Sequence, residues 1–520
     1  MKPKYILIII SLLLVLFAFT SCEDFLERYP STSVSGEDIF SSMETAEAGL
    51  IGLYNCLQSG DLTGRSTLIR GDMKSCDFML LTGSGQYFGY EYSYRDNVTN
   101  YGSAGVIWAQ GYQTIKDCNI FLDGISQVEG DEIEINDMIA QAKTIKAIAY
   151  IELVRTFCYP PNFGAIDAKY AMGIPLVRDK QDNVEAIITG PGRAPLSDVM
   201  TYIEELLNEA SDGIDPSRQP GAFISKPAIY GILARVLLYQ EKWQEAATAA
   251  VTASAAGSVI DHDDYLTAIR QDFNDECLFE LMYTETDNLA DRMPGYVINQ
   301  TVNANNRNDA TSLGYGDIGA TDAFLQLVKE NPNDIRIQLL HEDKMSTAPP
   351  DETNLVHGVN GYSERYYYKH IGGKNGNVHL HNIPYIKIPE VLLIAAESFS
   401  EMPGHDSEAL NYLNQVYSKR TGITLSDISG DELKDAIFNE RRRELALEGH
   451  GIWDFLRKNR SFTRDASNIT IVTIDPTTEA GRDDPNFYKV VSPIPITEMD
   501  ANPNIRDQQN PGYTAYQGSN

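Results

Sequence analysis

The sequence predicts a mainly α-helical fold, in which a tetratricopeptide-like scaffold of paired helices carries long irregular loops and a few short β-hairpins. Three observations support this prediction. Apolar residues recur at helical spacing through most of the chain. Small residues follow the spacing of a tetratricopeptide repeat in two places. Two long stretches, residues 71–101 and 284–317, are rich in Gly, Asn, Asp and Tyr and interrupt the helical pattern. Such long irregular stretches are typical of functional loops.

The chain begins with the pattern of an export signal. Lys2 and Lys4 precede an apolar run that is shorter than the ~20 residues of a membrane-spanning helix. Cleavage before Cys22 would leave a thiol that can carry acyl chains. We therefore expect residues 1–21 to be a lipoprotein signal peptide and Cys22 to be lipidated. The alternative is an ordinary secretory signal, because Phe19 stands three residues before the cysteine, where Leu is most common in lipoprotein signals.

Residues 22–36 contain Pro30 and a Ser/Thr-rich run, so we expect an extended tether there. We expect residues 37–520 to form a single domain. Within it, apolar periodicity predicts helices over residues 37–57, 133–157, 196–210, 227–255, 322–329, 389–419 and 431–459.

The helical-pair prediction depends on two stretches that match the spacing of tetratricopeptide positions. Small side chains at these positions let two antiparallel helices approach closely. Any alanine-rich helical hairpin would give the same pattern, so that alternative stays open. The matching residues are Tyr230, Leu233, Ala234, Leu237, Ala246, Ala250 and Ala253, and then Leu392, Ala395, Ala396, Phe399, Ala409, Leu413 and Val416.

Composition narrows the range of ligands. The formal net charge is −31, and such a chain lacks the clustered Lys and Arg that nucleic acids or anionic membrane surfaces require. We therefore expect no nucleic-acid partner. Five cysteines remain after Cys22 without a CxxC pair, and the sequence does not tell whether any of them are paired: Cys56, Cys76, Cys118, Cys158 and Cys277.

Several strings, in this order, resemble the SusD/RagB family of surface nutrient-binding lipoproteins of Bacteroidetes. Glu23 and Asp24 also resemble the acidic surface-export signal of such lipoproteins. The helix string ERRRELALEGH and the closing PIP…NP…QNPGY are the most specific parts. The resembling strings are Trp108–Asp123, Ala142–Phe157, Pro384–Glu397, Asn439–Phe455 and Pro493–Tyr513.

The resemblance implies a helical scaffold whose loops build a ligand site. It also implies location at the outer membrane through the lipid on Cys22, and a SusC-like, TonB-dependent barrel as partner. Family members capture oligosaccharides, or in some branches peptides, and are not known as enzymes. We therefore expect a glycan-binding protein without cofactors. A peptide-binding member of the family is the first alternative, and a glycoside hydrolase is the second.

Other charged and metal-ligating motifs have plainer interpretations. Glu444 and Glu448 lie four residues apart on one helical face near Arg441, so charge pairing explains them without catalysis. His370, His379 and His381 lie around the Gly372-Gly373 loop, and His379 and His381 would share one face of a strand. A metal there is the alternative, but no Cys or carboxylate stands at ligand spacing, so we expect His379 and His381 to be a solvent-facing pair. A structural calcium is not supported, because Asp261, Asp263 and Asp264 lack the Gly and Glu that complete a calcium loop.

Tyrosine-rich segments are the predicted ligand site, because aromatic rings pack on the C–H faces of sugars while their hydroxyls form hydrogen bonds. On a strand, Tyr90, Tyr92 and Tyr94 would present three rings on one face. These rings could equally be the packed side of a hairpin. Trp108 belongs to a scaffold string and is expected in the core. The predicted ligand-binding residues are Asp72, Tyr87, Tyr90, Tyr92, Tyr94, Arg95, Asn97, Tyr101, Tyr296 and Tyr315.

Overall fold

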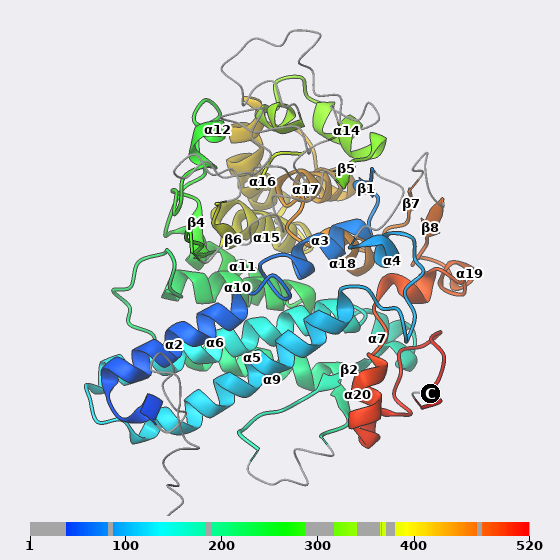
Figure 1. The fold of residues 1–520 in the computed structure, drawn as a ribbon. Helices are drawn as coiled ribbons and strands as arrows, with labels where there is room; N and C mark the ends of the chain where they lie inside the picture. Colours follow the sequence, from blue (N-terminus) through cyan, green and yellow to red (C-terminus); the bar gives the residue numbers. More distant parts are fainter. Residues whose placement is uncertain are drawn as a thin grey trace, which may run out of the picture.

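The computed structural model describes residues 38–81, 87–181, 190–286, 317–340, 365, 367–370, 380–464 and 471–518. It confirms the predicted mainly helical fold (Figure 1). The expected signal peptide, Cys22 and tether lie outside the described residues. The longer helices are α2 (Met43–Leu57), α3 (Ser66–Met73), α5 (Ala104–Gly124), α6 (Glu132–Phe157), α9 (Leu196–Gly213), α10 (Lys226–Tyr239), α11 (Trp243–Ser254), α14 (Asp322–Lys329), α15 (Ile388–Ser400), α16 (Asp406–Thr421) and α17 (Gly430–Glu444).

Shorter elements connect these helices. The short α-helices are α4 (Gly89–Tyr92), α7 (Phe163–Ile166), α12 (Tyr265–Ala268), α18 (Gly451–Arg457), α19 (Glu479–Arg482) and α20 (Ile496–Ala501). The 3₁₀ turns are η2 (Asp38–Phe40), η3 (Ile125–Gln127), η4 (Ala168–Tyr170), η6 (Ile335–Leu340), η10 (Phe487–Val490) and η11 (Pro503–Ile505).

Capping residues set where the first long helices begin. The Ser42 side chain accepts from the Thr45 amide at 3.2 Å, so α2 begins at Met43 and not near residue 37 as predicted. In α6, the Asp131 carboxylate accepts from the Ile133 amide at 2.8 Å, and Glu132 adds a favourable charge in the first turn.

The predicted helix pairs are present. α10 with α11 and α15 with α16 form helical hairpins, and α11 packs against both α10 and α15. Ala246, Ala250 and Ala253 are fully buried where these helices approach one another. The stack continues through α9 and α6 to α5, so the colours of Figure 1 pass in order from cyan to yellow across the scaffold.

Short strands fasten distant segments together. The local pairs are β2 (Met172–Pro175) with β3 (Arg193–Pro195), and β7 (Phe462–Arg464) with β8 (Val472–Ile474). The other described pairs are not hairpins, which corrects the prediction of β-hairpins alone. They join β1 (Phe78–Leu80) to β5 (Ile318–Ala320) and β4 (Cys277–Leu281) to β6 (Ile383–Lys387), all antiparallel.

The helix predicted over residues 431–459 is divided in two. α17 ends at Glu444, and Leu447 and Gly449 both have positive φ before α18 begins. A Cβ at Gly449 would lie 2.5 Å from the Thr67 carbonyl oxygen. The close approach of α3 therefore requires glycine here and ends the helix.

Buried ion pairs explain the charged string around α17, as predicted, but Glu448 lies beyond the end of α17 and so does not share a helical face with Glu444. Glu444 accepts from Arg420 at 3.0 Å, and Lys387 contacts both Glu444 and Glu448, at 3.1 and 2.8 Å. All these side chains are buried. The charges of α17 thus serve packing between helices.

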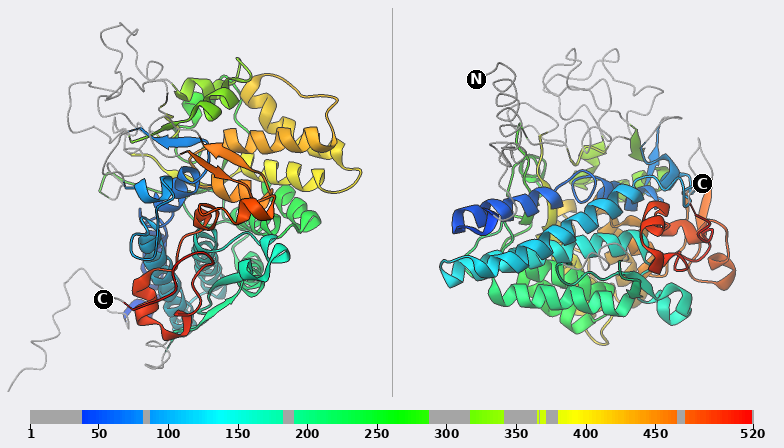
Figure 2. Two further views of the ribbon diagram at one scale, coloured as in Figure 1. Left: turned by 90° about the vertical axis from the view of Figure 1, so that its right-hand side faces the viewer. Right: turned by 60° about the horizontal axis from the view of Figure 1, so that its bottom comes forward.

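The C-terminal residues return to the helical scaffold (red in Figures 1 and 2). The Asn510 side chain donates to the carbonyl oxygens of Phe157 and Ser492, at 2.8 and 2.7 Å. Trp108 lies in the same core with α6, as predicted, and its ring contacts Phe157. The five described cysteines are all free.

Candidate ligand-binding site

Described residues of the two irregular segments, 71–101 and 284–317, lie side by side at one strand pair. β1 pairs with β5, and the Leu81 amide donates to the Asp317 carbonyl at 2.7 Å. The first segment therefore leaves this strand pair where the second arrives.

The second segment departs from a point that is also fixed. Tyr283 is buried, its hydroxyl donates to the Gln58 carbonyl at 2.6 Å, and its amide donates to the Asn382 side chain at 3.0 Å. Gln58 immediately precedes the turn that leads into α3. The scaffold thus holds both ends of this segment around α3 and β1.

Tyr87 and Arg65 form the polar–aromatic part of this region. The Arg65 guanidinium lies 4.2 Å from the centre of the Tyr87 ring. One of its nitrogens donates to the Tyr87 hydroxyl at 3.1 Å and to Asp61 at 2.9 Å. Burial raises the pKa of Tyr87, so the phenol stays neutral and can donate a hydrogen bond.

Tyr90 presents an open aromatic surface in this region. It belongs to α4, and 43% of its surface is exposed. An exposed ring can pack against the apolar face of a ligand. Tyr90 therefore stays in the proposed site.

Tyr92 and Tyr94 do not share a face with Tyr90, and the predicted strand is wrong. The chain forms the short helix α4 through Tyr92, and Tyr94 takes a left-handed conformation with φ 52°. Both residues are 1% exposed. The Arg464 guanidinium lies 3.9 Å from the centre of the Tyr92 ring and 5.6 Å from the centre of the Tyr94 ring. The Tyr94 hydroxyl donates to the Lys74 carbonyl. These two tyrosines pack in the interior beneath the segment and are too buried to contact a ligand.

The prediction that Asp72 binds the ligand is also wrong. Asp72 is 2% exposed, and its carboxylate accepts from the Gly449 amide at 2.8 Å. Burial raises its pKa. Asp72 fastens α3 to the link between α17 and α18 and cannot reach a ligand at the surface.

The remaining described candidates occupy the loop before α5. Arg95 is exposed, and its Nε donates to the Ser93 hydroxyl at 2.9 Å. The Asn97 side-chain oxygen accepts from the amides of Thr99 and Asn100, so it closes its own turn. Tyr101 is half-buried. Of the three, Arg95 has the most freedom to meet a ligand.

Glu91 holds this loop in place, and the sequence analysis did not identify it. Its buried carboxylate accepts from the Ser103 amide at 2.5 Å and from the Ser103 hydroxyl at 2.6 Å. Gly102 has φ +56°, and a Cβ there would lie 2.3 Å from the same carboxylate. The adjacent Gly102-Ser103 dipeptide was the only sequence signal available.

The other residues named in the sequence analysis lie outside the described ranges or away from this region. Tyr296, Tyr315 and His379 lie outside the described residues. His370 is buried, and one ring nitrogen hydrogen bonds with the Leu447 carbonyl. His381, expected to face solvent, is half-buried. Within the described ranges, no three His, Cys, Asp or Glu side chains gather as metal ligands would. The turn at Asp261 to Asp264 lies at the surface.

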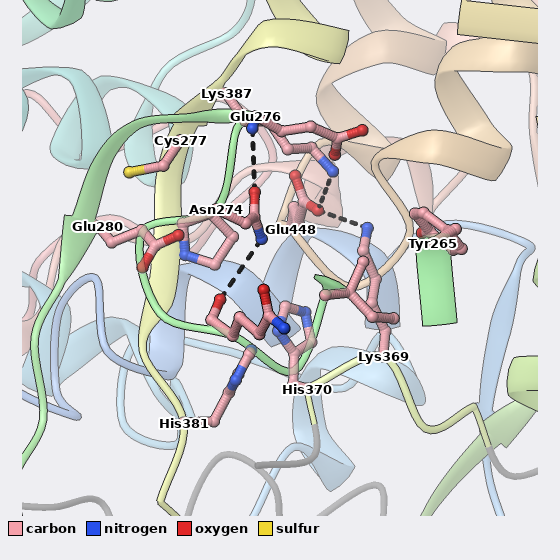
Figure 3. A pocket seen from close by; sticks show the side chains of 13 residues that line it. Tyr265, Asn274, Glu276, Cys277, Glu280, Lys369, His370, His381, Lys387 and Glu448 are labelled. Carbon is pink, nitrogen blue, oxygen red and sulfur yellow. Dashed lines mark hydrogen bonds and ion pairs between the residues drawn. The ribbon is translucent and has the colours of Figure 1, made fainter. Parts of the chain in front are cut away.

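A polar hollow beside β4 and β6 is too small for a sugar (Figure 3). Its volume is about 40 Å³, whereas ligand pockets measure about 300–1,000 Å³. Lys369 and Lys387 both point toward Glu448 across it, and His370 and His381 lie close together at its other side. This volume suits ordered water between buried charges.

Comparisons with known proteins cover nearly the whole chain. Residues 24–238 match a family model described as "Starch-binding associating with outer membrane", and residues 285–513 match the model of the SusD family. SusD-like protein P2 of Formosa agariphila is 26% identical, over 97% of this chain and 99% of its own. The chain belongs to the SusD family.

Solved SusD structures share the fold described above. A SusD superfamily protein from Bacteroides thetaiotaomicron has a TM-score of 0.76 at 24% identity, over 90% of this chain and 100% of its own. A putative sugar binding protein from Bacteroides vulgatus has a TM-score of 0.72 at 26% identity, over 91% of this chain and 99% of its own. Among the described residues, no helix of this SusD-family chain is long and apolar enough to cross a membrane.

Proposed function

We propose that this SusD-family protein binds oligosaccharides at the cell surface and delivers them to a SusC-like, TonB-dependent barrel in the outer membrane. The observation that carries the proposal is that α4, with the exposed ring of Tyr90, packs against α3 and β1, where β1 pairs with β5. The family membership and the sugar-binding description of the Bacteroides vulgatus relative support a carbohydrate cargo.

The chemistry of these side chains fits capture better than catalysis. An exposed ring such as that of Tyr90 contributes apolar area at low entropic cost, and the exposed Arg95 guanidinium offers hydrogen-bond donors to sugar hydroxyls. Hydrolysis would require two carboxyl groups about 5–10 Å apart across a cleft. We infer that cargo is held and released unchanged.

Affinity gels and calorimetry with a glycan panel test the proposal. We expect at least one glycan to bind, and Tyr90→Ala to weaken that binding by about tenfold, as loss of ~1.5 kcal/mol of aromatic contact predicts. Phe223→Ala is the matched control, because this ring is 42% exposed but packs on Tyr54 of α2. Binding of peptides and of no glycan would favour the peptide-binding alternative.

Three further experiments test the absence of catalysis, the lipid anchor and the transporter partner. Incubation with bound oligosaccharides should release no shorter products, and turnover lost in a single Asp or Glu variant would indicate a hydrolase.

Mass spectrometry of the membrane fraction should find acyl chains on Cys22, and purification from native membranes should bring a barrel transporter with the protein. An unmodified Cys22 would contradict the lipid anchor.

A further inference from the structure

An apolar groove of about 430 Å³ lies between α2 and α5. Ile39 and Phe40 of η2 form its wall at one side, and Ile120 and Phe121 of α5 line it with residues of α2. Its volume is in the range of ligand pockets. Apolar surface left in water is unfavourable, at about 25 cal/mol per Å². A groove of this kind is therefore suited to an apolar occupant.

Gly52 leaves this groove open, although no contact within the described structure requires a glycine at this position. It lies in the interior of α2, is exposed, and a Cβ there would meet nothing within 4 Å. A glycine inside a helix costs about 0.5–1 kcal/mol relative to alanine. Gly49 differs, because its Cβ would lie 2.7 Å from Ile39. The absent side chain at Gly52 makes room for a chain that lies over α2.

The N-terminal chain is positioned to supply this occupant. It enters the described structure at Asp38, directly beside Ile39 and Phe40 of the groove wall. Leu26 precedes Asp38 by 12 residues, which span up to about 40 Å when extended. The tether can therefore reach back along the whole groove.

Side-chain chemistry selects one part of the tether. Phe25 and Leu26 are the only adjacent pair of large apolar residues in the tether, where Tyr29 and Val34 stand singly. Asp117 on the groove accepts from the Gln113 side chain at 2.8 Å and from the Cys56 thiol at 3.6 Å, and it has no ion pair with a described cation. Arg28 follows the apolar pair at short range. We propose that Phe25 and Leu26 of the tether dock into the groove between α2 and α5, with Arg28 toward Asp117.

Docking would change how the protein is held at the membrane. A free tether from Cys22 to residue 37 spans up to about 50 Å, whereas docking at Phe25 leaves about 10 Å. The protein would then face the membrane in a restricted set of orientations. This consequence rests on the proposed lipid on Cys22, but the docking itself does not.

Cys56 allows a direct test because it lines the groove and is half-buried, while the other described cysteines are buried. The mature chain with Cys22→Ser would carry either Phe25→Cys or Leu26→Cys, with Ser33→Cys as the matched control. Burial and Asp117 raise the pKa of Cys56 to about 11, so oxidation requires pH 9 and excess copper–phenanthroline. Disulfides are identified by mass spectrometry of non-reduced peptides.

We expect an intramolecular disulfide to Cys56 from position 25 or 26, at least fivefold more abundant than from position 33. Cys56→Ser should abolish it. Gly52→Trp, which fills the groove, should reduce it at least fivefold and expose residues 25–29 to faster amide hydrogen exchange. Equal yields at all three positions, or no effect of Gly52→Trp in a folded protein, would overturn the proposal. Disulfides between two chains would also overturn it, in favour of a second copy in the groove.

Discussion

Neighbouring tyrosines after β1 have opposite surroundings, and the backbone between them explains why. α4 turns Tyr90 outward, while Tyr92 and the left-handed Tyr94 pack on Arg464. Glu91, between Tyr90 and Tyr92, points inward to Ser103 and fixes the orientation of the whole loop. Presentation of one exposed ring therefore depends on three buried neighbours.

Glu91→Gln tests the cost of this arrangement. Burial raises the pKa of Glu91, and one of its oxygens has no hydrogen-bond partner. Because the folded-state pKa lies above the ordinary value of 4.5, this group's contribution to stability is complete below pH 4.5 and is lost as the pH rises through the folded-state pKa. We expect denaturant titrations to show the stability of Glu91→Gln rising relative to wild type as the pH increases above 4.5.

Glu91→Ala is the control, because it removes the acceptor for Ser103 as well as the charge. Because neither variant titrates at position 91, Glu91→Ala should be about 1–3 kcal/mol less stable than Glu91→Gln at every pH. A Glu91→Gln variant whose stability relative to wild type does not change with pH would show that the carboxyl titrates normally.

At the scale of elements, backbone contacts rather than side-chain pattern decide where α17 and α18 meet α3. Gly449 lies against the Thr67 carbonyl, and its amide donates to Asp72. A buried ion pair also joins α18 to α15. The Arg457 guanidinium of α18 donates two hydrogen bonds to the Glu397 carboxylate of α15, at 2.5 and 2.8 Å. Steric fit and ion pairing thus act at the same junction.

Gly449→Ala should lower the free energy of unfolding by more than about 2 kcal/mol, because it adds a steric clash to the ordinary cost of a left-handed residue. Gly404→Ala is the matched control. Gly404 has φ +86°, but a Cβ there meets nothing within 4 Å, so only about 1 kcal/mol should be lost. Equal losses in urea titrations would show that the contact with α3 tolerates a methyl group.

Glu397→Gln should destabilise the protein by about 3–5 kcal/mol at pH 7, because the buried Arg457 would keep only one of its two carboxylate partners, Asp454. Burial alone would raise the pKa of Glu397, but Arg457 and Lys458 hold it far below 4.5. This contribution is therefore present above pH 4.5 and is lost as the pH falls below it.

Glu209→Gln is the control for that measurement. Glu209 pairs with Lys143 at 2.7 Å at the surface, and its side chain is 59% exposed. Loss of this pair should cost less than about 1 kcal/mol. Urea titrations at pH 7 and pH 4 compare the two variants, and a similar small loss in both would contradict the role of the buried network.

At the scale of the molecule, residues from both ends of the described chain share one core. The main apolar cluster runs from Ala46 of α2 to Ile505 of η11. Asn510 closes this arrangement by satisfying two carbonyl groups near the end of α6. A common core favours unfolding as one unit.

Asn510→Ala tests this coupling, because it leaves the carbonyls of Phe157 and Ser492 without their donor. We expect a loss of about 1–3 kcal/mol and a lower temperature for the whole calorimetric transition. Asn504→Ala removes an exposed hydrogen bond to Gly190 and should have little effect. A separate low-temperature transition in Asn510→Ala would indicate that the C-terminal segment unfolds alone.

Local patterns predicted the scaffold well and the site only in part. Helical periodicity located α6, α14 and the α10–α11 pair, because those patterns depend on near neighbours. Alternation of Tyr90, Tyr92 and Tyr94 gave a strand, because the contacts of Arg464 and Ser103 with this segment come from outside it. The division between α17 and α18 likewise depends on Thr67, nearly 400 residues earlier in the chain.

The pairing of β1 with β5 has an evolutionary consequence. Closing a longer loop costs only about 0.6 kcal/mol for each doubling of its length. Since Tyr283 and Asp317 fix where the intervening chain leaves and returns, insertions and deletions between them should leave the scaffold intact. Exchanging this stretch between relatives should therefore change the loop while it leaves the helical scaffold intact.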